Sequence, residues 1–262
     1  MAIMKKTALI TGASSGIGAD FTRLFAKDGY DLVLVARSEG KLREMAAQLS
    51  KEFGIAVEVI AADLSESDAA QKIVDALAAK NIDIEALVNN AGLGLSGAFV
   101  ETDLKRELEM IAVNVVALTH LTKLLLPPMV ARKHGYVLNV ASTASFQPGP
   151  LMAVYYATKA YVLSLSEALS EELRNSGVTV TALCPGPTET GFAAAAEAGV
   201  TRLFTMRKPM ASADVARKGY EAMKRGKRVV ITGFMNRVMA ESVRISPRRV
   251  VTTIVRKMQE KA

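Results

Sequence analysis

The sequence contains a single cysteine, Cys184, among its 262 residues. One thiol excludes an intrachain disulfide framework and a metal site built from cysteines, and it is typical of a protein that works in a reducing compartment. Long apolar runs are scarce as well. The most apolar stretch, residues 115–130, is interrupted by His120, Lys123 and two prolines, so no membrane-spanning segment is predicted. We therefore expect a soluble, cytoplasmic protein.

Acidic residues are scarce in the last quarter of the chain. Residues 207–262 contain 15 Lys and Arg but 4 Asp and Glu, which gives this segment a charge of +11 and leaves −4 for residues 1–206. A basic segment is first a candidate for nucleic-acid binding, but its only aromatics are Tyr220 and Phe234, and it contains no nucleic-acid reader motif. Nucleic acid is therefore not an expected partner.

Short β-branched runs alternate with longer helical patterns, which predicts βαβ units around a parallel sheet. The expected fold is α/β: a single doubly wound, Rossmann-type domain over residues 1–262, with about seven strands flanked by helices on both faces and a basic helical segment from about 234 to 262. Expected helices begin near Ser15, Ser38, Ser67, Thr102, Val154 and Ser212, several on a residue suited to cap free amides. The expected strands are 7–11, 31–36, 56–61, 84–89, 136–140, 178–184 and 229–232.

A glycine-rich turn follows the first expected strand and opens into a helix. Its sequence is T-G-A-S-S-G-I-G, residues 11–18. Glycines suit a tight turn whose backbone approaches a pyrophosphate, and the free amides at the helix start hold the anion. The turn therefore predicts dinucleotide binding through Gly12, Ser14, Ser15, Gly16, Ile17 and Gly18.

The spacing T-G-x-x-x-G-x-G, in place of G-x-G-x-x-G, resembles that of the classical short-chain dehydrogenase/reductase family. Where NAD-preferring members of this family carry an acid, the chain has Ala36, followed by Arg37 and Ser38. Because an arginine pairs with a 2′-phosphate, these residues indicate NADP(H), and how strictly NADP is preferred stays open. Further cofactor contacts that the resemblance implies are Asp63, Leu64, Asn90, Ala91, Gly92, Tyr155, Lys159, Pro185, Gly186, Thr188 and Thr190.

Tyr155 and Lys159 lie four residues apart and so share one face of an expected helix. A lysine beside a phenol stabilises the phenolate, which lowers the pKa of the tyrosine toward neutral pH. Y-x-x-x-K is common on surface helices, so the pair needs support from elsewhere in the chain. Ser142 supplies it, because it precedes Tyr155 by thirteen residues, as in the family, and this spacing selects Tyr155 over Tyr156.

The resemblance implies a catalytic set of Asn114, Ser142, Tyr155 and Lys159. Ser142 holds the substrate oxygen, Tyr155 transfers the proton, Lys159 acidifies Tyr155 and holds the nicotinamide ribose, and Asn114 maintains a water in a proton relay. The expected activity is NADP(H)-dependent interconversion of a carbonyl and a secondary alcohol, with a 3-oxoacyl or steroid-like ketone as substrate. A generic aldehyde, ketone or quinone reductase and a catalytically silent NADP-binding sensor or scaffold are the alternatives.

Two regions outside the motifs bear on the substrate. The alanine-rich residues 191–207 are expected to close over it, and residues 246–258 form an amphipathic helix with Val250, Val251, Ile254, Val255 and Met258 on one face. That helix docks on the body or on a neighbouring subunit, contacts a membrane surface weakly, or attracts an acidic carrier or acyl thioester; the sequence leaves these readings open. We also expect a homo-oligomer, a dimer or a tetramer.

Overall fold

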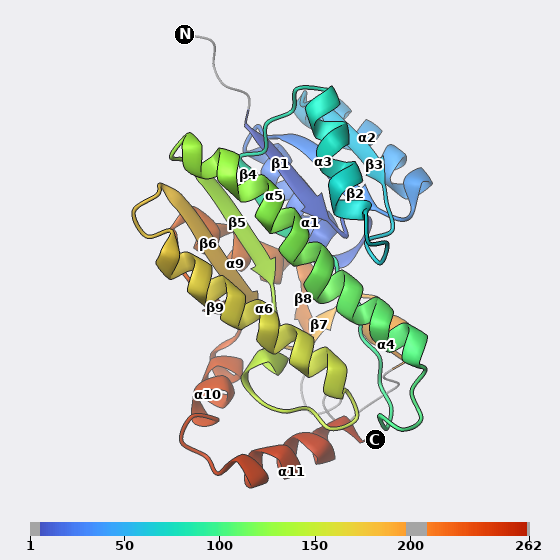
Figure 1. Ribbon diagram of the computed structural model, residues 1–262, viewed down its shortest axis with the longest axis vertical. Coiled ribbons are helices and arrows are strands. Elements are labelled where there is room, and N and C mark those ends of the chain that lie inside the picture. The colour runs from blue at the N-terminus through green and yellow to red at the C-terminus, as the bar shows by residue number, and fades with distance from the viewer. Residues whose placement is uncertain (1–5, 198–208, 261–262) are drawn as a thin grey trace.

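The computed structural model describes residues 6–197 and 209–260. Its centre is a seven-stranded sheet in the order β3-β2-β1-β4-β5-β6-β9, with every neighbouring pair parallel (Figure 1). The expected doubly wound parallel sheet is therefore confirmed. The strands are β1 (Thr7–Thr11), β2 (Asp31–Ala36), β3 (Val57–Ala61), β4 (Ala86–Asn89), β5 (Gly135–Val140), β6 (Val178–Cys184) and β9 (Val229–Ile231).

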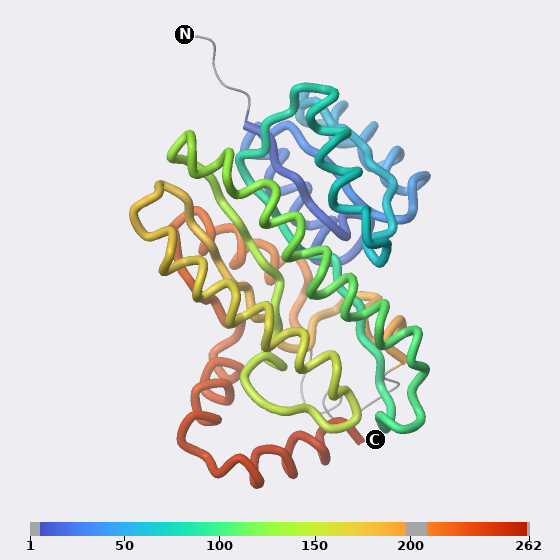
Figure 2. The backbone as a smooth tube through the Cα atoms, viewed as in Figure 1, coloured from blue at the N-terminus to red at the C-terminus, as the bar shows by residue number. Residues whose placement is uncertain are grey.

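Helices cover both faces of this sheet, and a second, two-stranded sheet pairs β7 (Thr188–Glu189) with β8 (Met210–Ala211). Figure 2 traces the same arrangement and shows the last two helices folding back under the body. The helices are α1 (Gly16–Lys27), α2 (Glu39–Phe53), α3 (Ala69–Ala79), α4 (Leu104–Ile111), η1 (Ala112–Ala117), α5 (Leu118–Ala131), η2 (Thr143–Phe146), α6 (Ala153–Glu172), α7 (Phe192–Ala195), α9 (Ser212–Lys224), α10 (Phe234–Ser242) and α11 (Arg248–Gln259).

The alternation of side chains along each strand divides the core into two layers. In β1, Ile10 packs with Phe21 and Phe25 of α1 on one face, whereas Leu9 packs with Ile73 of α3 and Leu121 of α5 on the other. All of these side chains are buried. Each contributes about 1.5–3 kcal/mol by leaving water, so the two layers hold the sheet between its helices.

The strand order places a crevice at the carboxyl ends of β1 and β4. From β1 the chain builds outward to β2 and β3, and it then returns to the other side of β1 with β4, β5, β6 and β9. Loops leaving β1 and β4 therefore run in opposite directions. A ligand site is expected where they part.

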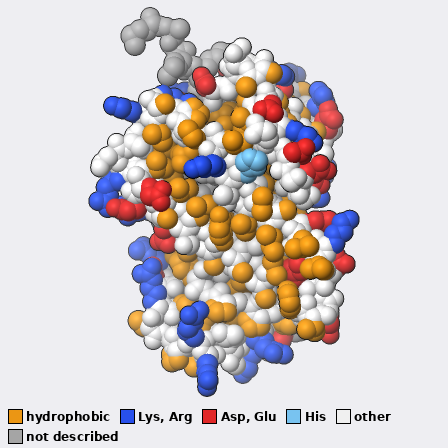
Figure 3. All heavy atoms as spheres, in the orientation of Figure 1, with side chains coloured by type: hydrophobic (Ala, Val, Ile, Leu, Met, Phe, Trp, Pro, Cys, Tyr) orange, Lys and Arg blue, Asp and Glu red, His pale blue; other side chains and the backbone are white. Residues whose placement is uncertain are grey.

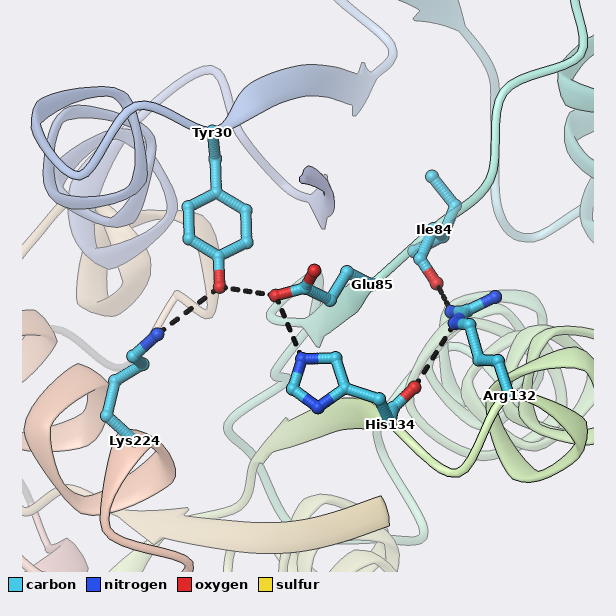
Figure 4. A network of polar contacts seen from close by, with 6 residues as sticks. All are labelled: Tyr30, Ile84, Glu85, Arg132, His134 and Lys224. Atoms are coloured by element: carbon cyan, nitrogen blue, oxygen red, sulfur yellow. Dashed lines mark hydrogen bonds and ion pairs between the residues drawn. The ribbon is translucent and has the colours of Figure 1, made fainter. Parts of the chain in front are cut away.

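A polar network ties the two halves of the sheet together at the opposite, amino-terminal edge (Figure 4). The Tyr30 hydroxyl donates to Glu85 Oε1 at 2.8 Å, and His134 Nε2 lies 3.4 Å from the same oxygen. Lys224 Nζ of α9 donates to the Tyr30 hydroxyl at 3.3 Å. Burial and the neighbouring Glu85 carboxylate raise the pKa of Tyr30. Protein side chains therefore hold the strands together at their amino-terminal ends. The ligand site is expected at the opposite edge of the sheet, at the carboxyl ends of the strands.

The expected serine and threonine caps are wrong for five helices. Ser15 and Ser38 precede α1 and α2, but neither side chain accepts a capping hydrogen bond; both line the cavity described below. The helices α3 and α4 begin after aspartates, and Asp103 accepts from the Arg106 amide at 2.9 Å. The helix α9 begins at Ser212 itself, after Ala211.

The helix that carries Asn114 runs without a break from residue 104 to 131, through α4, η1 and α5. Its 18-residue window has a mean hydropathy of 1.6, so by length and composition alone this one helix of the described chain could cross a membrane, contrary to our expectation. Buried helices of soluble proteins have the same composition. Here 44% of the window is buried, and Leu121, Leu125 and Met129 pack against the sheet.

Candidate active site

A cavity of about 540 Å³ opens at the carboxyl ends of the strands. It brings together nearly all of the residues that the sequence predicted for the site, from motifs spread over residues 12–190. Gly18 and Asn114 do not line it. The predicted residues that do are Gly12, Ser14, Ser15, Gly16, Ile17, Arg37, Ser38, Asp63, Leu64, Asn90, Ala91, Gly92, Ser142, Tyr155, Lys159, Pro185, Gly186, Thr188 and Thr190.

The glycine-rich turn is built for close backbone approach. Gly12 and Gly16 have φ of +64° and +53°, which side chains rarely adopt. A Cβ at Gly18 would lie 2.1 Å from the Gly12 carbonyl oxygen, so α1 packs directly on the turn. Asn90 clamps the turn from β4, because its Nδ2 donates to the carbonyls of Thr11 at 2.9 Å and Gly12 at 3.2 Å. Gly18 thus shapes the cavity although it does not line it.

The start of α1 suits an anion. Its first turn contains no acidic residue, and no side-chain cap occupies its amides. The positive end of the helix dipole therefore faces the cavity through the glycine turn. A Cβ at Gly16 would lie 3.0 Å from Thr190 Cγ2, which shows that the turn after β6 closes over the glycine turn from the other side. These residues fit a pyrophosphate.

Arg37 and Asp63 lie on neighbouring strand ends beside this turn. Asp63 Oδ1 accepts hydrogen bonds from the Ser65 amide at 2.9 Å and the Ser65 hydroxyl at 2.7 Å. These bonds, with a smaller contribution from the Arg37 charge, hold the pKa of Asp63 below its usual value. The carboxylate is thus fixed and charged at neutral pH. The pair fits the adenosine half of a dinucleotide.

Ser142 and Tyr155 meet at the other end of the cavity. Ser142 precedes η2, accepts from the Ala144 amide at 3.1 Å and lies 3.5 Å from the Pro185 carbonyl oxygen. Burial raises the pKa of Tyr155 to about 12, against the opposing effect of a hydrogen bond with Ser142. The phenol is therefore protonated at neutral pH and lies beside a second hydroxyl.

Lys159 is buried, with 4% of its surface exposed, and its Nζ donates to the Val140 carbonyl at 2.8 Å. Burial lowers the pKa of Lys159 to about 8. We expected Lys159 to lower the pKa of Tyr155, but in this structure the burial of the phenol raises it. The geometry explains the difference, since Nζ points to Val140 and lies 5.8 Å from the centroid of the Tyr155 ring.

Asn114 lies in η1, a short π-helical segment of the long helix, and π-helical turns are frequent at functional sites. Its Nδ2 donates to the Leu93 carbonyl at 2.9 Å and to Thr158 Oγ1 at 3.0 Å, and its Oδ1 accepts from the Leu93 amide at 2.8 Å. Asn114 therefore braces the loop after β4 against α6, next to Lys159. The water-holding role that the resemblance implies stays a prediction.

The substrate end of the cavity contains residues that no motif predicted. Phe192 of α7 lies with its ring centroid 5.3 Å from that of Tyr155. The expected lid is described only in part, since residues 198–208 lie outside the described residues. Gln259 was missed because it is polar, although it follows Val251 and Val255 at a spacing of four. Phe192 belongs to the expected lid, whereas the lining residues that the sequence did not predict include Glu109, Val113, Met152, Tyr156 and Gln259.

This chain belongs to the short-chain dehydrogenase family, because the sequence model of that family matches residues 6–200. The family resemblance noted from the motifs is confirmed. Members of this family are oxidoreductases that act on small-molecule carbonyl or alcohol substrates. The cavity of this chain is the site for a nicotinamide dinucleotide, NAD(P)(H), which the glycine turn and the open start of α1 fit.

One curated relative and two solved structures show which members of the family this chain is similar to. The chain is 36% identical over 175 residues to a very-long-chain 3-oxoacyl-CoA reductase of Laccaria bicolor, covering 66% of this chain and 52% of that protein. It thus spans about half the length of that relative. Among solved structures, a short-chain dehydrogenase from Sphingobium yanoikuyae in complex with NADPH has a TM-score of 0.83 at 34% identity, covering 94% of both chains. A bulky-bulky ketone specific alcohol dehydrogenase from Comamonas testosteroni has a TM-score of 0.78 at 31% identity, covering 92% of both.

Proposed function

We propose that the protein is an NADP(H)-dependent carbonyl reductase that also runs in reverse as a secondary alcohol dehydrogenase. One observation carries the proposal: Ser142, Tyr155 and Lys159 converge at one end of a cavity whose other end holds the glycine turn and Arg37. A sensor or scaffold has no use for a protonated phenol aligned with a serine hydroxyl. The catalytically silent alternative is therefore disfavoured.

The proton chemistry follows from the two hydroxyls. When bound, the dinucleotide supplies the hydride for reduction or accepts it in oxidation. Ser142 donates a hydrogen bond to the substrate oxygen and stabilises the charge that develops there. Tyr155, whose pKa of about 12 keeps it protonated at neutral pH, gives that oxygen its proton. Lys159 places a positive charge beside the phenol and holds the ribose.

The preference for NADP rests on the end of β2. Ala36 offers no carboxylate to a ribose diol, and Arg37 and Ser38 both line the cavity. A guanidinium recognises a 2′-phosphate by charge-assisted hydrogen bonds. The Sphingobium neighbour in complex with NADPH supports the same choice.

We infer a bulky, largely apolar ketone as the substrate, with a 3-oxoacyl thioester as the first candidate. Met152, Phe192, Ala193 and Ala195 give the cavity an apolar wall beside Tyr155. The Laccaria relative is named for a 3-oxoacyl-CoA and the Comamonas neighbour for bulky ketones, which supports both features. A steroid-like ketone fits the same wall.

The test is NADPH oxidation, followed by absorbance, with a panel of 3-oxoacyl thioesters, steroid ketones, bulky aryl ketones, quinones and short aldehydes. The proposal expects turnover on the first three classes. Turnover confined to quinones and aldehydes would indicate a generic reductase. Binding of NADPH with no turnover on any member would support the sensor or scaffold instead.

We further propose that two copies of the chain associate through the face formed by α4, η1, α5 and α6. Figure 3 shows a band of hydrophobic side chains down the middle of this face. Its exposed apolar members are Leu104, Leu108, Ile111, Val116 and Tyr161. Soluble proteins rarely expose a patch of this extent without a partner. Light scattering of the purified chain tests this, and a monomer at every concentration would overturn it.

The basic C-terminal surface remains a predicted contact for a membrane or an acidic carrier. Four of its cations, Arg237, Arg248, Arg249 and Lys257, make no ion pair with any described residue. They are exposed, and Ile245 and Val250 lie exposed near them. Such a surface attracts acidic partners by long-range charge.

A further inference from the structure

Gln259, in the last turn of α11, is buried with only 4% of its surface exposed, yet it lines the active-site cavity. Figures 1 and 2 show α11 folding back under the body, below the segment that joins β5 to α6. Val251 and Val255, two turns and one turn earlier on the same face, pack with Met152 and Tyr156. The C-terminal helix therefore delivers a glutamine side chain to the substrate end of the site.

The partner of Gln259 is the second of the two adjacent tyrosines. Gln259 Nε2 donates a hydrogen bond of 2.7 Å to the Tyr156 hydroxyl. Within the described chain, no residue accepts the proton of that hydroxyl or bonds to Gln259 Oε1, and both residues line the cavity. The pair thus offers one free donor and one free acceptor to whatever enters the cavity.

The surroundings of this pair are apolar. Ala144, Met152, Ala196 and Val255 pack around Tyr156, and Phe192 joins the same cluster. A few polar groups in an apolar pocket fix the orientation of a ligand, because a mismatched polar atom loses its hydration without a replacement partner. The Tyr156–Gln259 pair is therefore placed to recognise a polar atom of the substrate.

The pair lies next to the reacting phenol. The ring centroids of Tyr155 and Tyr156 lie 6.1 Å apart, at an interplanar angle of 77°, and both residues line the same cavity. Two carbonyl oxygens separated by a single methylene lie only a few ångströms apart. This adjacency favours a substrate that carries a second carbonyl close to its keto group.

We propose that the Tyr156–Gln259 pair binds the second carbonyl oxygen of a 3-oxo ester or 3-oxo thioester. The keto oxygen lies against Ser142 and Tyr155, and the Tyr156 hydroxyl donates to the ester or thioester oxygen. Gln259 is a positioning residue, because its hydrogen bond orients the Tyr156 hydroxyl toward the cavity. The inference rests on the proposed carbonyl reductase function and specifies its substrate.

The test compares two ketones of the same seven-atom chain, ethyl 3-oxobutanoate and 2-heptanone, of which only the first has a second carbonyl. Wild type, Gln259→Leu, Tyr156→Phe and the double variant are assayed with NADPH. Since a hydrogen bond to a substrate contributes about 0.5–1.5 kcal/mol, each single variant should lose about 2–12-fold in kcat/KM on the ester. On 2-heptanone the loss in kcat/KM should stay below about twofold, because this ketone has no second carbonyl to accept the hydrogen bond.

The double variant tests whether the two residues act as one unit. If Gln259 works through Tyr156, the double variant should lose no more than Tyr156→Phe alone. Thr253→Val on the exposed side of α11 is the matched control and should leave the kcat/KM for both substrates unchanged. NADPH binding, measured by fluorescence, and thermal melting show whether a variant is folded and loaded.

Two results would overturn the inference while leaving the reductase function intact. One is a wild type that reduces both ketones without preferring the ester. The other is an equal loss on both ketones in Gln259→Leu, which would show a merely structural role for α11. Failure of the wild type to reduce any ketone, with NADPH bound, would remove the proposed function and this inference together.

Discussion

Lys159 Nζ and the carbonyl oxygen of Val140 lie 2.8 Å apart in the interior, where Lys159 has 4% of its surface exposed. A single carbonyl does not replace the hydration of a cation. Burial therefore lowers the pKa of Lys159 to about 8, from 10.5 in an unfolded chain. The buried charge of Lys159 therefore destabilises the folded protein, at the place where the proposed chemistry needs a positive charge.

Replacing Lys159 by Met should therefore stabilise the protein while abolishing its turnover. The difference in pKa corresponds to roughly 3 kcal/mol of destabilisation by the charged lysine at neutral pH. After subtracting about 1 kcal/mol for the lost hydrogen bond to Val140, we expect the free energy of unfolding of the variant to rise by about 1–2 kcal/mol. Denaturant unfolding at pH 7 measures the change in the free energy of unfolding, and NADPH oxidation measures the loss of turnover.

The difference in stability between Lys159→Met and the wild type should also depend on pH. The folded pKa of Lys159 lies below the unfolded value, so its cost is fully present below about pH 8 and fades as the pH rises toward 10.5, where the unfolded chain also loses the proton. The stability advantage of Lys159→Met should shrink over that window. An advantage that stayed constant from pH 7 to 10 would show that folding does not lower the pKa of Lys159.

Tyr155→Phe should bind NADPH normally and lose turnover by at least about a thousandfold. The reason is that the substitution removes the hydroxyl that gives the substrate oxygen its proton. Tyr156→Phe, which removes the same atom from the neighbouring residue, is the control and should keep its activity on a simple ketone. The comparison is made on 2-heptanone, with cofactor affinity measured by fluorescence. Near-normal turnover in Tyr155→Phe would refute the assignment of the proton donor.

Arg37→Asp should raise the KM for NADPH by about 10–100-fold and change that for NADH by less than about threefold, because the lost charge-assisted bonds concern only the 2′-phosphate. Arg43→Asp is the matched control. It makes the same charge change on α2, where Arg43 pairs with Glu39 on the exposed side. Equal effects on the two cofactors would remove the proposed preference for NADP.

Local sequence patterns were sufficient to predict the parts of the site that depend on backbone geometry. The strands ending at Thr11, Ala36, Asn89 and Cys184 were predicted with the same ends, because β-branched runs stop at turn residues. Since parallel strands share a carboxyl edge, their trailing motifs had to meet there. The order of the motifs along the chain therefore predicted both the fold and the place of the cavity.

Features that depend on contacts between distant segments were not predictable. Gln259 is polar and lies at the end of a basic helix, so no local pattern distinguishes it from a solvated residue; only its packing against Tyr156, 103 residues away, makes it part of the cavity. The direction of Lys159 toward Val140 and the burial that raises the pKa of Tyr155 likewise follow from the folded interior. Ser15 and Ser38, which were expected to cap helices, line the cavity instead.

Two glycines that look alike in sequence should respond oppositely to the same methyl group. A Cβ at Gly18 would lie 2.1 Å from the Gly12 carbonyl oxygen and 2.5 Å from Asn90 Nδ2, whereas one at Gly40 in α2 would meet no atom within 4 Å. Gly18→Ala must push α1 off the glycine turn, and we expect a loss of about 1–3 kcal/mol in stability and weaker NADPH binding.

Gly40→Ala should instead gain about 0.5–1 kcal/mol, since alanine loses less conformational freedom in a helix. Thermal unfolding and cofactor fluorescence of both variants check the pair. If Gly18→Ala melted and bound NADPH like the wild type, the close contact between α1 and the turn would not be what shapes the phosphate end of the cavity. Because Gly18 itself does not line the cavity, a loss of binding would have to pass through the displaced turn.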